Sequence, residues 1–81
     1  MPSEPQSPEA KLMALEFGLT VRRLREQLGV SQEKFAEMTG HHRTYIGFLE
    51  RGERTPNIFT ASRVAKALNL SLAELAEEAG I

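Results

Sequence analysis

Arg43, Thr44, Gly47 and Phe48 are the residues of this sequence whose types and spacing most clearly suit a chemical task. On a helix over residues 43–50 they would share one side, because about 100° per residue places them within about 140° of the circumference. Arg43 can donate two hydrogen bonds to O6 and N7 of guanine, and Thr44 can contact a base edge. Gly47 would allow close approach of the backbone, and the Phe48 ring suits a thymine methyl group. The four residues predict a helix that reads bases in the major groove of DNA.

A second set of residues around this helix has the chemistry to contact the DNA backbone. Gln32 and Asn57 each stand at the expected start of another helix, where unpaired backbone N–H groups attract phosphate. The alternative is that Asn57 is only a cap, and that Arg51 and Arg54 only keep a loop soluble. The predicted backbone-binding residues are Gln32, His42, Tyr45, Arg51, Arg54, Thr55 and Asn57.

Capping residues, glycines and apolar spacing predict five helices and no strand, an all-α fold. The first helix begins at Ser7-Pro8-Glu9-Ala10, has Phe17, Val21, Leu24 and Leu28 inside, and ends at Gly29, with Gly18 able to divide or bend it. The second runs from Ser31 to Gly40, and the third opens at His42 and stops at Gly52. The second and third helices, with the tight turn between them, have the pattern of a helix-turn-helix.

The C-terminal part of the chain predicts two more helices. Asn57 caps the fourth, which has Ile58, Ala61, Val64, Ala65 and Leu68 inside. Ser71 and Glu74 form a capping box for the fifth, which ends near Ala79-Gly80. Leu70, Leu72, Leu75, Ala79 and Ile81 provide an apolar edge, at which we expect a two-fold homodimer. The competing interpretation is a protein-interaction module that holds a partner at this edge.

Length and composition restrict the class of protein. Eighty-one residues with 41% apolar content suit one small domain over residues 8–81, preceded by a flexible segment, 1–7, rich in Pro, Ser and Glu. The N-terminus does not resemble a signal peptide, and no apolar run has membrane length, so we expect a cytoplasmic protein. The sequence has no cysteine, and therefore no disulfide or thiolate metal site.

The net charge of −1 hides an uneven distribution. Residues 20–66 carry nine Lys or Arg against five Glu, whereas the rest of the chain carries one Lys against six Glu. Salt screens charges beyond about 8–10 Å, so the local surplus over residues 20–66 matters more to a phosphate than the total. Double-stranded DNA is the expected partner.

An enzyme is improbable, because the sequence has no nucleophile–base set and no glycine-rich phosphate loop. Glu37, His41 and His42 are the residues nearest to a metal-ligand pattern, but Gly40 ends the helix that would bring Glu37 and His41 together. We predict no metal and no cofactor.

The order Gln32-x-x-Phe35-Ala36-x-x-x-Gly40-x-x-x-x-Tyr45-Ile46-x-x-Leu49-Glu50-Arg51-Gly52-x-x-x-Pro56 resembles the Cro/phage-repressor helix-turn-helix family, over about residues 17–78. The segments His42–Ile46 and Leu49–Arg54 look most like the controller proteins of restriction-modification systems. The resemblance implies a lambda-repressor-like fold and a small dimer that binds operators before its own and the nuclease genes. Antitoxins and prophage repressors share much of the motif.

The resemblance also implies roles for single residues. Arg43 and Thr44 occupy base-reading positions, and Tyr45 and Arg54 occupy backbone-contacting ones; the family often has a polar side chain at the position of Phe48. Arg25 and Glu50 match a charge pair that links two helices. Glu33 and Glu37 stand where phage repressors touch RNA polymerase; a merely solvated face is the favoured alternative.

Overall fold

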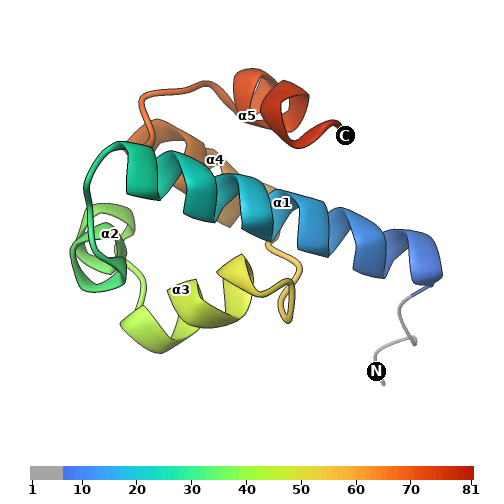
Figure 1. Cartoon of the computed structure of the whole chain (residues 1–81), viewed down its shortest axis with the longest axis horizontal. Helices are drawn as coiled ribbons and strands as arrows, with labels where there is room; N and C mark the ends of the chain where they lie inside the picture. The colour runs from blue at the N-terminus through green and yellow to red at the C-terminus, as the bar shows by residue number, and fades with distance from the viewer. Residues whose placement is uncertain (1–6) are drawn as a thin grey trace.

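The computed structural model describes residues 7–81, which form five helices and no strand (Figure 1). In chain order the helices are α1 (Pro8–Gln27), α2 (Gln32–Thr39), α3 (Arg43–Glu50), α4 (Ile58–Ala67) and α5 (Leu72–Ala79). The predicted all-α fold class is confirmed. The flexible segment predicted for residues 1–7 lies outside the described residues except for Ser7, which caps α1.

Each helix begins where the sequence supplies a capping side chain. Ser7, Ser31, Asn57 and Ser71 each accept a hydrogen bond from the backbone N–H three residues later. His42 caps α3 through Nδ1, which accepts the N–H of Thr44 at 3.0 Å. A cap contributes about 1 kcal/mol. The starts of α2 and α3, on which the predicted interface depends, are therefore fixed by local chemistry.

α1 crosses the middle of the molecule, with α2 and α3 on one side and α5 on the other (Figure 1). It packs mainly on α3 and α5, while α2 packs on α3 and α4. Every helix contributes at least one large, fully buried apolar side chain to the core: Val21, Phe35, Ile46, Leu49, Val64 and Leu75. Burial of such a side chain is worth roughly 1.5–3 kcal/mol, so the core fixes how α3 lies against its neighbours.

Two residues predicted for the core lie at the surface. Ile58 is 76% exposed, because it stands in the first turn of α4, at the edge of the face that Ala61 and Val64 bury. Leu28 is 44% exposed and serves as the C-cap of α1, beyond the last turn that faces the core. The apolar spacing identified both helices correctly but extended each buried face one residue too far.

The predicted dimerisation edge needs a larger correction. Leu75 and Ala79 are buried in the core, where α5 packs against α1 and α4, so they are not available to a partner. Leu70 and Leu72 are half-buried against the same core, and Ile81 is exposed. Of the five predicted residues, Ile81 is therefore the most accessible to a partner, and Leu70 and Leu72 are accessible only in part.

Gly18 does not divide α1, which is continuous from Pro8 to Gln27. Instead it lies buried at the crossing with α3. A Cβ atom at this position would lie 2.3 Å from the carbonyl oxygen of Leu49 and 2.7 Å from that of Glu50. Glycine therefore allows the last turn of α3 to approach the backbone of α1 more closely than any side chain would permit.

We expect Gly18→Ala to lower the free energy of unfolding by about 1–3 kcal/mol, because the contacted carbonyl groups belong to rigid helix backbone. Gly47→Ala is the matched control, since the nearest atom to its Cβ is the flexible end of Arg51 at 3.1 Å. Alanine gains up to about 1 kcal/mol over glycine in a helix, so the control should keep or raise stability. Urea denaturation measures both, and equal midpoints would contradict the packing described for Gly18.

Candidate nucleic-acid interface

The turn between α2 and α3 is built from Gly40, His41 and His42. Gly40 has φ 74°, in the left-handed region, and ends α2. The N–H of His41 donates to the carbonyl of Ala36 at 3.0 Å, which closes the turn. α3 then sets off in a new direction with Ile46 fully buried beneath it.

Arg43 and Thr44 lie exposed on the outward side of α3, as the base-reading prediction requires. The Arg43 side chain is 63% exposed, and its Nη1 lies 3.5 Å from Oε1 of Glu33 on α2. Both residues border a shallow hollow of about 290 Å³, lined by Gln32, His42, Arg43, Thr44, Gly47 and Arg51. Guanidinium and hydroxyl donors on an exposed helix face can meet base edges.

Gly47 is not open to a ligand in the way that its helical position suggested. It is buried, and the Arg51 guanidinium lies next to its Cα, 3.1 Å from where a Cβ would stand. A DNA backbone could come close to Gly47 only after Arg51 moved. Base reading at Gly47 therefore stays a prediction that requires the Arg51 side chain to move.

Phe48 also differs from the open ring that the sequence suggested. Its side chain is half-buried, and the Cζ atoms of Arg51 and Arg54 lie 5.3 and 5.0 Å from the ring centroid. Both distances fall in the range of cation–π contacts. Three residues predicted to contact DNA separately are thus in contact with one another.

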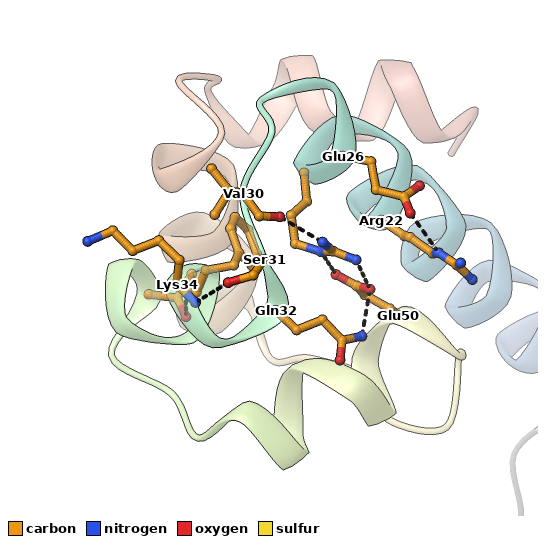
Figure 2. A network of polar contacts seen from close by, with 10 residues as sticks. Arg22, Glu26, Val30, Ser31, Gln32, Lys34 and Glu50 are labelled. Atoms are coloured by element: carbon orange, nitrogen blue, oxygen red, sulfur yellow. Dashed lines mark hydrogen bonds and ion pairs between the residues drawn. The ribbon is translucent and has the colours of Figure 1, made fainter.

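Several predicted phosphate-binding side chains already have partners within the chain. Gln32 donates from Nε2 to Glu50 at 3.0 Å, His42 caps α3, and Asn57 accepts the N–H of Thr60 at 2.8 Å (Figure 2 for Gln32). The Arg51 guanidinium pairs with Glu53. Arg54 and Thr55 lie exposed in the loop before α4.

Tyr45 lies at the border of the interface, half-buried, with its ring centroid 4.9 Å from that of His41. Burial raises the pKa of the Tyr45 phenol above its ordinary value, while the charge of Arg54 acts in the opposite sense. The hydroxyl therefore remains protonated at neutral pH and can donate a hydrogen bond to a phosphate oxygen.

A buried polar network holds the C-terminal end of α3 (Figure 2). Arg25 of α1 donates from Nε to Oε2 of Glu50 at 2.6 Å and from Nη2 to Oε1 at 3.0 Å. Its Nη1 donates to the carbonyl of Val30 at 2.7 Å, and Gln32 donates to the same carboxylate. The hydrogen bond to Glu50 is the main cause that raises the pKa of Arg25. This is the pair of residues that the family resemblance implied.

The two acidic residues considered for a polymerase contact are exposed on α2, and both have basic neighbours. Glu33 faces Arg43, and the Glu37 carboxylate lies 3.9 Å from Nζ of Lys34. The Arg43–Glu33 pair was not foreseen, because it joins two helices across the turn and no sequence spacing signals it. The partner of Arg51 was also missed, although Glu53 follows only two residues later.

Other kinds of site find little support within residues 7–81. No three His, Asp or Glu side chains in this range are arranged so that they could hold a metal ion. Within the same range, no helix combines the length and apolar character needed to cross a membrane.

The capped turn, the buried side of α3 and its polar outer side together define a helix-turn-helix protein. A helix-turn-helix family model (HTH_3) matches residues 21–75, from Val21 in α1 to Leu75 in α5. The chain belongs to this family. The control protein C.SmaI of Serratia marcescens is 46% identical over 61 residues, which cover 75% of this chain and 73% of that protein.

Solved structures give the same fold. The restriction-modification controller protein C.AhdI from Aeromonas hydrophila aligns with a TM-score of 0.73 and 37% identity, over 76% of this chain and 94% of that one. The clp gene regulator ClgR from C. glutamicum aligns with a TM-score of 0.80 and 26% identity, over 99% of this chain and 95% of that one. The backbone is thus shared among regulators whose names point to different genes.

Because the Glu50 side chain is only 2% exposed, we expect Glu50→Ala to lower the free energy of unfolding by about 3–5 kcal/mol, leaving the Arg25 charge buried without its partner. Glu37→Ala is the matched control, since it removes an ion pair with Lys34 in which both side chains are more than half exposed. That loss should stay below about 0.5 kcal/mol. An unchanged melting temperature in Glu50→Ala would show that the network does not stabilise the fold.

Proposed function

We propose that this chain is a transcriptional regulator that controls a restriction-modification operon by binding a pseudo-palindromic operator as a homodimer. The observation that carries the proposal is the outward face of α3, where Arg43 and Thr44 are exposed on a helix whose opposite side is locked into the core. A rigid helix with exposed donors suits direct base recognition, because each base pair presents its own donor and acceptor pattern in the major groove.

The charges around α3 favour the same partner. Arg43, Arg51 and Arg54 are exposed on or next to this helix, and Glu33 and Glu53 compensate for two of them through exposed pairs. Exposed ion pairs contribute little stability, so a phosphate or guanine can replace the carboxylate at small cost. Tyr45 and Thr55 extend the proposed backbone contacts.

Similarity favours a controller protein within the wider family. C.SmaI and C.AhdI are named as control proteins, and each aligns with this chain over most of its own length. ClgR has the higher TM-score but the lower identity, which supports a common fold rather than common target genes. We therefore infer that the target lies in a restriction-modification operon.

A homodimer would bury apolar surface that α5 and its neighbours leave open. Ile81 is 47% exposed, and together with Leu72, Met13 and Phe17 it lines an apolar cavity of about 180 Å³ where α1, α5 and the loop before α4 meet. A two-fold axis at this edge would present two copies of α3 about 34–36 Å apart, one turn of DNA.

A contact with RNA polymerase through α2 is the remaining part of the proposal. Glu33 lies next to Arg43, so its replacement would disturb base reading as well as any polymerase contact. Glu37 instead pairs with Lys34 of the same helix, at 3.9 Å. Transcription with the Glu37→Ala variant, at equal operator occupancy, therefore tests the contact alone.

Binding to the DNA upstream of the chain's own gene should survive an excess of unrelated duplex and should weaken steeply as salt rises. Footprinting should show two half-sites about one helical turn apart, and sedimentation should show a dimer at the same protein concentration. Weak, equal binding to both DNAs would contradict the proposal and favour the protein-interaction module. A monomer that protects a single half-site would contradict the dimer only.

We expect Arg43→Ala to weaken operator binding by about 1–3 kcal/mol and to relax the preference at one base pair. Arg54→Ala should weaken binding to all sequences alike and reduce the salt slope by about one unit. Arg22→Ala, which removes an exposed arginine of α1 that pairs with Glu26, is the control and should bind normally. Titrations over a panel of single-base operator variants separate the two effects, and the same loss of selectivity in both variants would refute the assignment.

A further inference from the structure

Phe48 gathers two arginines at the end of α3. The Arg51 Cζ atom lies 5.3 Å and the Arg54 Cζ atom 5.0 Å from its ring centroid. Both guanidinium groups therefore lie close to one ring, although Arg51 ends α3 and Arg54 belongs to the following loop. The quadrupole of an aromatic ring attracts a cation placed over its face, so the ring can hold both.

The backbone of Phe48 organises the same loop. Its carbonyl oxygen accepts the N–H of Glu53 at 2.9 Å, which turns the chain back toward α3 directly after Gly52. Glu53 also pairs with Arg51. The loop from Arg51 to Asn57 has no regular secondary structure of its own. Its first residues are held by Phe48, through the ring on one side and the backbone carbonyl on the other.

The charge balance at the ring points to an anion. Two guanidinium groups repel each other, and the Glu53 carboxylate pairs with only one of them, Arg51. A phosphate group would relieve the repulsion, and a guanidinium fixed over a ring keeps its N–H edges available for two parallel hydrogen bonds to phosphate oxygens. Less side-chain freedom is lost on binding when the guanidinium is already held in place.

We propose that Phe48 is a positioning residue: its ring holds Arg51 and Arg54 for a DNA phosphate and does not itself read a base. The inference rests on the proposed function, because it requires DNA at α3. It replaces the expectation that the ring meets a thymine methyl group, since a half-buried ring beside two guanidinium groups has little surface left for a base.

Phe48→Leu and Phe48→Tyr separate the ring from its apolar volume. We expect Phe48→Leu to weaken binding to operator and to unrelated duplex by the same factor, about five- to thirtyfold, because two arginine side chains that the ring no longer holds must be ordered on binding. Phe48→Tyr keeps a ring and should bind nearly as the unchanged chain does. Neither variant should change the relative affinities across single-base operator variants.

Phe59→Leu is the matched control. The Phe59 ring also has an arginine over it, with the Arg63 Cζ atom 5.5 Å from the centroid, but this pair lies in a groove with Met38 and Lys66 on the α2–α4 side. Its DNA affinity should not change. A similar loss in Phe59→Leu and Phe48→Leu, at equal folded fraction by circular dichroism, would overturn the inference.

A double-mutant cycle with Arg54→Ala supplies the decisive measurement. If Phe48 acts through Arg54, Phe48→Leu should cost much less affinity in the Arg54→Ala background than in the unchanged chain. Additive losses would show that Phe48 does not act through Arg54, and a loss of preference confined to one base pair would show that its ring contacts a base; either result would overturn the inference. Absence of selective binding by the unchanged chain would instead refute the proposed function, so the two failures are distinguishable.

Discussion

The orientation of α3 depends on the buried pair between Arg25 and Glu50. Removing a guanidinium and a carboxylate from water costs several kcal/mol for each ion, and their attraction offsets this only when the remaining donors and acceptors are also used. Here the Val30 carbonyl accepts from Arg25, and Gln32 donates to Glu50. These hydrogen bonds form together in one arrangement of α1, α2 and α3, and an arrangement that separated Arg25 from Glu50 while keeping either buried would leave a charge without a partner.

Gly18 makes this arrangement geometrically possible. It lies against the carbonyl groups of Leu49 and Glu50, so the same end of α3 that carries the buried carboxylate also comes into backbone contact with α1. Gln32 brings the start of α2 to the same place. Three helices are thus joined at one end of α3. With Ile46 buried beneath the helix and His42 capping its start, the other end directs Arg43 outward.

Local signals in the sequence were sufficient to predict where the helices lie, but not which of their residues are exposed. The helix starts at Ser31, Asn57 and Ser71 could be predicted, because a cap is a contact between near neighbours in the chain. The coverage of Gly47 by Arg51 and the burial of Leu75 depend on how elements pack in space, which periodicity does not report. Helical periodicity alone predicted that Arg43 and Thr44 are exposed on α3. The cluster around Phe48 could not be predicted, because it depends on how the following loop folds back onto the helix.

The buried ion pair of Arg25 with Glu50 stabilises the fold, whereas the exposed pair of Arg43 with Glu33 matters for the proposed recognition of DNA. The pair of Arg43 with Glu33 is well exposed on both sides, so it adds little to stability, yet it gives the guanidinium a partner in the absence of DNA. On the proposed function, a guanine would replace this partner with two hydrogen bonds, whereas a base without matching acceptors would displace it without compensation. Selectivity would then come partly from the ion pair with Glu33 that Arg43 gives up on a sequence without matching acceptors. This contribution requires that the buried Arg25–Glu50 pair hold α3 where Arg43 can reach both Glu33 and the DNA.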